Sequence, residues 1–184
     1  TEINMEELST IPTPCTTKIQ ALRDSIAQII VGQTQATDLL LTSVIARGHV
    51  LIEGVPGVAK TLLARVMAQL IDARFSRVQF TPDLMPSDVL GTTVYNMKTG
   101  DFDVHPGPVF ADVVLADEIN RSPAKTQAAL FGVMEERQVT VDGTPRAMSD
   151  VFTIIATQNP VEQEGTYKLP EAQLDRFLMK ITMD

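Results

Sequence analysis

Residues 54–61 read Gly-Val-Pro-Gly-Val-Ala-Lys-Thr (GVPGVAKT), and the fold prediction starts from this segment and its two neighbours. The short apolar run His49–Glu53 (HVLIE) precedes it, and Thr61–Leu70 (TLLARVMAQL) follows with apolar residues at helical spacing. A strand, a glycine-containing loop and a helix, in this order, are the context that a phosphate-binding loop requires. In such a loop, backbone amides and the helix N-terminus hold a polyphosphate.

The predicted nucleotide contacts are the loop residues and the residue after them: Gly54, Val55, Pro56, Gly57, Val58, Ala59, Lys60, Thr61 and Leu62. Lys60 would reach the β- and γ-phosphates of ATP, and the Thr61 hydroxyl would be a ligand of Mg2+. The usual pattern has glycine before the lysine, so the backbone at Ala59 must accommodate a methyl group. The alternative is an ordinary Gly-Pro-Gly loop with Lys60 at the surface, because short motifs produce false matches.

Two adjacent acids, Asp117 and Glu118, follow the continuous apolar run Val113–Ala116 (VVLA). At the carboxyl end of a buried parallel strand, they would lie beside the phosphate loop. Asp117 would bind magnesium through its water shell, and Glu118 would orient or deprotonate the attacking water. The alternative is a strand that simply ends in polar surface residues, and the order of the two motifs along the chain argues against it.

Two further polar residues are candidates for catalysis. Asn159 follows the apolar run Phe152–Ala156, so it would contact the γ-phosphate or the water at the same sheet edge; it also precedes a proline, which favours a turn. Arg176 precedes the last apolar run, Phe177–Ile181. It would reach the γ-phosphate of a neighbouring subunit, or form a salt bridge with Asp175 or another nearby acid, and both interpretations remain open.

The order of the predicted elements indicates the fold class. Strands separated by helices predict a three-layer α/β/α sandwich with a central parallel sheet and right-handed crossovers. The predicted strands are 49–53, 75–80, 113–116, 152–156 and 177–181, and two helices precede the first of them. Residues 1–16, which contain two prolines, are expected to form a flexible arm, and residues 17–184 one domain.

Composition restricts the functional classes. The 184 residues are 44% hydrophobic, which fits one globular domain with a core. Fifteen basic and 23 acidic residues give a net charge of -8, so nucleic acid is not an expected partner. The one cysteine, Cys15, and two distant histidines predict no structural zinc and fit a reducing cytoplasm. The sequence contains no run of the ~18 to 20 apolar residues that a membrane-spanning helix needs, so no span is expected.

Several stretches together resemble the MoxR family of AAA+ ATPases. They are Ile30–Gln33 (IVGQ), Gly54–Thr61, Gln79–Thr92 (QFTPDLMPSDVLGT), Ala116–Leu130 (ADEINRSPAKTQAAL) and Ala156–Phe177 (ATQNPVEQEGTYKLPEAQLDRF). The resemblance implies a P-loop NTPase core that uses ATP and Mg2+ and has the phosphate loop as its Walker A motif. It also implies that Asp117 and Glu118 are the Walker B pair, Asn159 the first sensor and Arg176 an arginine finger.

The resemblance further implies the surroundings of the core. It implies an insert around Asp83–Gly107 and a hairpin near Val139–Met148, and local glycines and alternating residues agree with both. It implies self-association into a ring, with a hexamer as the expected size, and a protein client or a von Willebrand factor A domain partner. A helical lid normally follows such a core; the sequence ends at Asp184, directly after its last predicted strand, so the lid is expected to be absent.

Three functions remain open at this point. The favoured one is an oligomeric ATPase that remodels protein clients, since the charge is acidic. A DNA-associated motor or loader would need a basic hairpin, and only Arg137 and Arg146 lie near the predicted one. A nucleotide-gated binding module with little hydrolysis is the third, because arginine-dependent ATPases are nearly idle alone. Arg121, beside the acid pair, would sense nucleotide, bridge subunits or hold a loop.

Overall fold

A five-stranded parallel sheet forms the centre of the molecule in the computed structural model, which describes residues 14–55, 57, 59–141, 143–159, 167 and 169–183. Its strand order is β2-β5-β8-β1-β9, and each neighbouring pair is parallel. The strands are β1 (Val50–Gly54), β2 (Phe75–Gln79), β5 (Val113–Asp117), β8 (Thr153–Gln158) and β9 (Met179–Met183). The predicted parallel α/β sheet is therefore confirmed.

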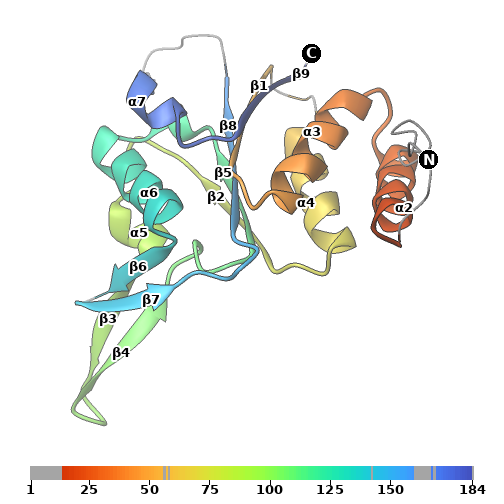
Figure 1. Ribbon diagram of the computed structural model, residues 1–184. Helices are drawn as coiled ribbons and strands as arrows, with labels where there is room; N and C mark the ends of the chain where they lie inside the picture. Colours follow the sequence, from red (N-terminus) through yellow and green to blue (C-terminus); the bar gives the residue numbers. More distant parts are fainter. Residues whose placement is uncertain are drawn as a thin grey trace, which may run out of the picture.

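Helices cover both faces of the sheet (Figure 1), which completes the three predicted layers. One face carries α2 (Pro14–Ile29), α3 (Thr34–Ile45) and α4 (Lys60–Leu70). The other carries α5 (Pro86–Leu90), α6 (Ala124–Glu136) and α7 (Glu171–Leu174). A short 3-10 helix, η1 (Ile119–Arg121), follows β5.

Alternate side chains of the central strands fill two separate cores. Val50 and Ile52 of β1 pack in the core with α2, α3 and α4, whereas Leu51 packs in the core with α6. Strand β5 alternates in the same way, and all five of its residues are buried. A strand covered on both faces reads as a continuous apolar run, which explains why the sequence located β5 so well.

Two antiparallel hairpins extend from the α5 and α6 side. They consist of β3 (Gly91–Asn96) with β4 (Asp101–Pro106), and of β6 (Gln138–Val141) with β7 (Thr144–Ala147). The first hairpin projects well beyond the sandwich (Figure 1). The predicted insert thus contains a short helix and a hairpin, and the second hairpin lies where the sequence predicts one.

Each predicted strand differs from the observed one by one or two residues at an end, and two of the differing boundaries have a clear physical reason. Helix α2 begins at Pro14, so the last three residues assigned to the flexible arm are helical. Proline suits the first helical turn, where its missing N–H would have no intrahelical partner. The last strand begins at Met179, two residues later than predicted, because the ring of Phe177 packs edge-to-face on Phe131 of α6 (centroids 5.9 Å apart).

Candidate functional site

A cavity of about 460 Å³ lies at the sheet edge where β1 and β5 end. It is lined by Gly57, Ala59, Lys60, Thr61, Leu62, Arg77, Gln79, Asp117, Glu118 and Asn159. The fold therefore brings together the phosphate loop, the acid pair and Asn159, which are far apart in sequence. Of the other predicted contacts, Gly54 and Val55 lie at the end of β1 and directly after it, and Pro56 and Val58 fall outside the described residues.

The loop between β1 and α4 has the backbone conformation that its glycine pattern suggests. Ala59 is left-handed (φ 57°, ψ 22°), which explains why glycine is usual there and shows that this backbone accepts a methyl group. Helix α4 begins at Lys60, so its N-terminal amides and partial positive charge lie at the cavity. The Lys60 ammonium donates to the Gly54 carbonyl oxygen at 2.6 Å. Burial lowers the pKa of Lys60, and the nearby charges of Asp117 and Glu118 oppose that shift.

Both carboxylate oxygens of Asp117 accept hydrogen bonds. Oδ1 accepts from the hydroxyl of Thr157 on β8 at 2.5 Å. Oδ2 accepts from Nη2 and Nε of Arg77 on β2, at 2.7 and 3.2 Å. The Thr157 hydroxyl, which is fully buried, also accepts from the backbone N–H of Glu118 at 2.9 Å. One hydroxyl from the neighbouring strand therefore fixes both acids.

The Glu118 carboxylate is held by two side chains. Its Oε2 accepts from Nε2 of Gln79 and from Nη1 of Arg121, each at 2.9 Å. The backbone of Glu118 is left-handed (φ 55°, ψ 49°), a conformation that costs a non-glycine residue on the order of 1–2 kcal/mol. Arg121 thus ties the η1 turn to the acid, one of the three roles that the sequence left open.

Sequence reasoning missed Arg77, Gln79 and Thr157. Gln79 pairs with Asp117 in the β2–β5 register, and Arg77 lies two residues earlier on the same face of β2. A signal was present, because Arg77 and Gln79 are polar residues spaced by two in a strand that was predicted from its alternation, so they share one face. Thr157 is a polar residue at the end of an apolar run, and its partners depend on how β8 pairs with β5.

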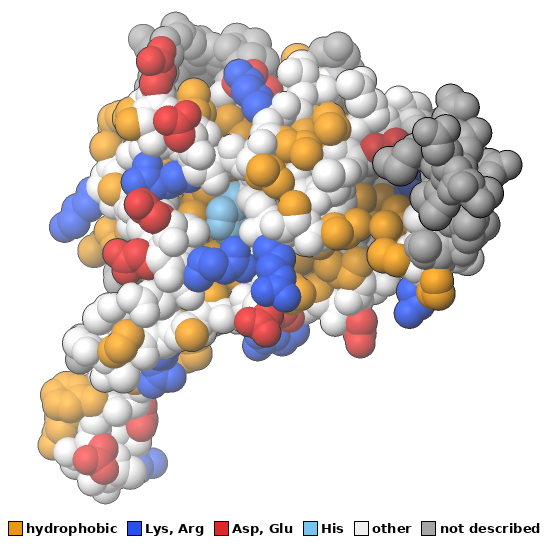
Figure 2. Space-filling model, in the orientation of Figure 1, with side chains coloured by type: hydrophobic (Ala, Val, Ile, Leu, Met, Phe, Trp, Pro, Cys, Tyr) orange, Lys and Arg blue, Asp and Glu red, His pale blue; other side chains and the backbone are white. Residues whose placement is uncertain are grey.

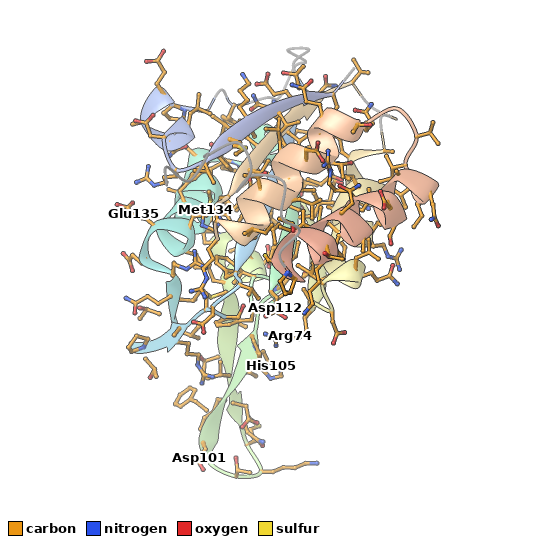
Figure 3. All side chains as sticks on the ribbon, turned by 45° about the vertical axis from the view of Figure 1, so that its right-hand side comes forward. Arg74, Asp101, His105, Asp112, Met134 and Glu135 are labelled. Carbon is orange, nitrogen blue, oxygen red and sulfur yellow. The ribbon has the colours of Figure 1, made fainter. Side chains whose placement is uncertain are left out.

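Arg176 lies away from this cavity. It donates to Oε2 of Glu135 on α6 from Nη2 and Nε, at 2.6 and 3.1 Å, and to the Ala172 carbonyl oxygen at 2.9 Å. The pair borders a separate cavity of about 400 Å³, and Figure 3 shows Glu135 on the outer side of α6. Within one chain, Arg176 therefore forms a salt bridge with a nearby acid, as one of its two interpretations predicted.

The donor set of the cavity fits a magnesium nucleotide. Mg2+ prefers oxygen ligands, and the Asp117 carboxylate and the Thr61 side chain line the same cavity. Lys60 and the start of α4 supply positive charge for phosphate oxygens.

None of the described helices is long and apolar enough to cross a membrane.

Comparisons with known proteins agree with this geometry. The profile of the ATPase family associated with various cellular activities (AAA) matches residues 49–179. Chaperone MoxR1 of Mycobacterium tuberculosis is 52% identical over 158 residues, which cover 86% of this chain and 42% of that protein. Protein MoxR of Methylorubrum extorquens is 39% identical over 164 residues, which cover 86% of this chain and 47% of that protein.

A solved structure gives the same result. The crystal structure of a candidate ATPase from Cytophaga hutchinsonii matches with a TM-score of 0.82 and 52% sequence identity. The match covers 91% of this chain and 51% of that one. The chain thus spans about half the length of the relatives that it matches.

Proposed function

Because the chain belongs to the MoxR family of AAA+ ATPases, we propose that it binds ATP with Mg2+ and hydrolyses it within an assembly of several copies. The observation that carries this proposal is the meeting of the Lys60 loop, the Asp117–Glu118 pair and Asn159 around one cavity. Residues 17–184 would form the ATPase core of a chaperone-like remodeller of protein clients, for which the name of the M. tuberculosis relative is the support. Since ATP is consumed inside the cell, the proposed location is the cytoplasm.

Each residue around the cavity has a proposed role. Lys60 and the N-terminal amides of α4 would bind the β- and γ-phosphates, and Thr61 and Asp117 would hold the metal. Bound Mg2+ would neutralise charge on the phosphate oxygens. Glu118 would orient the attacking water through its carboxylate, of which Oε2 accepts the hydrogen bonds from Gln79 and Arg121. Asn159 would contact the γ-phosphate or the same water.

Arg176 would act on a neighbouring copy of the chain. It does not line its own cavity, so a γ-phosphate that it contacts must belong to another subunit. Its side chain is 31% exposed, and its ion pair with Glu135 would open to allow the contact. This arrangement supports a ring, for which a hexamer is the expected form, with a protein client or a von Willebrand factor A domain partner.

A second candidate function is nucleotide-gated binding with little hydrolysis. The two hydrogen bonds on Glu118 favour it, because they hold Oε2 and so restrict the movement of the carboxylate that would orient the water. The DNA-associated alternative has less support. Arg137, one of the two cations near the second hairpin, donates instead to the backbone carbonyl oxygens of Arg47 and Phe152.

Equilibrium ATP binding and turnover, measured against protein concentration, test the proposal. Lys60→Ala is expected to lose ATP binding, whereas Glu118→Gln binds ATP but turns over at least ~100-fold more slowly. Wild-type activity should rise faster than linearly with concentration. Arg176→Ala should lower it by about 10³-fold while leaving ATP affinity unchanged. Lys180→Ala is the control for loss of a cation. Lys180 is paired with Glu53 and does not line the cavity, so this variant should bind and hydrolyse ATP like wild type.

The outcomes separate the candidates. Unchanged ATP binding in Lys60→Ala would show that the phosphate-loop assignment is wrong. Tight binding with turnover that stays low at every protein concentration would favour the nucleotide-gated module. Turnover that is strictly proportional to concentration, and indifferent to Arg176→Ala, would contradict the role of a neighbouring subunit.

A further inference from the structure

Arg77 occupies one of the two carboxylate oxygens of Asp117, a proposed ligand of the metal. Its guanidinium donates from Nη2 and from Nε to Oδ2, at 2.7 and 3.2 Å, and its side chain is 48% exposed at the cavity. We propose that Arg77 and Mg2+ compete for this oxygen, so that Arg77 sets how strongly nucleotide binding depends on magnesium. The inference rests on the proposed function, since it assumes that a magnesium nucleotide binds here.

The two carboxylate oxygens of Asp117 differ in what a cation would have to displace. Oδ1 accepts from the buried hydroxyl of Thr157, which also holds the Glu118 backbone, so this oxygen cannot be released without disturbing both acids. Oδ2 has two lone pairs, and the two N–H groups of Arg77 use both. A metal, or a water in its shell, that binds Oδ2 therefore displaces at least one bond of Arg77, and one that binds the second lone pair of Oδ1 still meets the positive charge of Arg77 beside it.

Arg77 is also linked to the other acid. Its Nη2 donates to Oε1 of Gln79 at 3.0 Å, and the Gln79 amide donates to Glu118 at 2.9 Å. When Arg77 leaves Asp117, the position of Gln79 loses one of its supports. Loading of the metal at Asp117 would thereby weaken one of the two hydrogen bonds on Glu118, whereas the bond from Arg121 would remain. Arg77 is a positioning residue in this scheme.

A second arginine–aspartate ion pair lies beside the same two strands, β2 and β5, and it provides a comparison because it is not part of the cavity. Arg74, just before β2, donates from Nε and Nη2 to both carboxylate oxygens of Asp112, each at 3.0 Å. The pair lies away from the cavity lining, with the two residues side by side in Figure 3. Hydrogen bonding from Arg74 holds the pKa of Asp112 well below its usual range. Arg74 is therefore a matched control three residues from Arg77.

The experiment measures the binding of a fluorescent ATP analogue at fixed concentration while Mg2+ is titrated from EDTA upward. In Arg77→Ala, the half-saturating magnesium concentration should fall about three- to tenfold below wild type, as expected for loss of a half-exposed, charge-assisted competitor. Arg77→Lys should fall between them, because an ammonium cannot donate two parallel bonds. Arg74→Ala should match wild type. Thermal unfolding of each variant shows whether it is folded, and Arg77→Lys carries the test if Arg77→Ala is not.

Three results would overturn the inference. The first is an unchanged or higher magnesium midpoint in both Arg77 variants. The second is weaker analogue binding by the same factor with magnesium and with EDTA, which would place Arg77 on the phosphates. The third is wild-type binding that is tight but independent of magnesium. If wild type does not bind the analogue under any condition, the proposed function itself fails, which is a distinguishable outcome.

Discussion

At the scale of single residues, Thr157 connects two strands through one hydroxyl. It donates to Asp117 Oδ1 and accepts from the Glu118 N–H in a fully buried position. Thr157→Val keeps the shape but leaves a buried carboxylate oxygen and a backbone N–H unpaired. We expect a loss of about 1–3 kcal/mol in the free energy of unfolding, together with weaker magnesium-dependent ATP binding.

Denaturant unfolding and nucleotide titration check this expectation. Thr153→Val is the control, because Thr153 is equally buried on β8 but its hydroxyl donates locally to the Val151 carbonyl oxygen. Thr157→Ser should restore most of both properties, since it returns the hydroxyl. Equal effects of the two valine substitutions would contradict the special position of Thr157.

His49 makes stability depend on pH. Its Nδ1 accepts from the N–H of Ile154 at 2.9 Å and its Nε2 donates to the Met134 carbonyl oxygen at 3.2 Å, so the ring must be neutral. Burial lowers the pKa of His49 from 6.5 to about 4; the bond to Met134 opposes this shift and the charge of Arg137 adds to it. Because the folded-state pKa is depressed, the unfolded chain takes up the proton first.

Stability from His49 is therefore present above pH 6.5 and is lost as the pH falls towards 4. We expect wild type to lose up to about 3 kcal/mol over this window from this residue. His49→Gln should be less stable at neutral pH but should lose less on acidification. Urea unfolding at several pH values measures the difference in unfolding free energy between wild type and His49→Gln. The carboxylates that titrate in both proteins contribute equally and cancel in this difference. Parallel curves for the two proteins would exclude the histidine as the cause.

At the scale of elements, two glycines let the base of the first hairpin close. A Cβ on Gly107 would lie 2.3 Å from the Val89 carbonyl oxygen and 2.4 Å from the Gly91 backbone nitrogen. These are backbone atoms, so they cannot rotate away. Gly107→Ala is expected to cost about 1–3 kcal/mol of unfolding free energy by overpacking.

Gly132 provides the matched comparison. It lies within α6, and an added Cβ there would meet nothing within 4 Å. Gly132→Ala should stabilise the protein by about 0.5–1 kcal/mol, because alanine loses less conformational freedom in a helix. Equilibrium unfolding of both variants gives the two values, and the same sign for both would show that the close approach at Gly107 is tolerated.

At the largest scale, the β3–β4 hairpin packs against a core at its base, through Val104 of β4, and its outer part projects away from the sandwich. Its tip carries exposed apolar side chains, with Met97 90% and Phe102 70% exposed, and they gather at the end of the projection in Figure 2. Thr93 pairs with Val104, so an Asn-Gly turn can replace residues 94–103 without changing the register. We expect the shortened protein to unfold within about 1 kcal/mol of wild type and to bind ATP equally.

Circular dichroism during thermal unfolding and a nucleotide titration check this result. The double substitution Tyr95→Ser and Phe102→Ser is the milder control, since it removes an edge-to-face ring pair with centroids 5.2 Å apart but keeps the hairpin. A large loss of ATP affinity in the shortened protein would show that the projection supports the nucleotide cavity.

The fold class and the main contents of the cavity could be predicted from local features of the amino-acid sequence. Strands and helices follow from hydrophobic periodicity, which is local, and parallel strands bring their carboxyl ends to one edge. Lys60, Asp117 and Asn159 could therefore be placed together before any contact was known. The last strand was located two residues early because apolar Phe177 serves the α6 core and not the sheet.

The hydrogen-bond partners of these residues follow from the folded structure and could not be read from the motifs. The contacts of Asp117 with Arg77 and with Thr157 each join positions 40 residues apart, and the ion pair of Arg176 with Glu135 joins positions 41 apart. Such contacts depend on strand register and on side-chain rotamers, which periodicity does not encode. The hydrogen bonds that fix Asp117 and Glu118 therefore depend on the folded structure and cannot be predicted from the motifs alone.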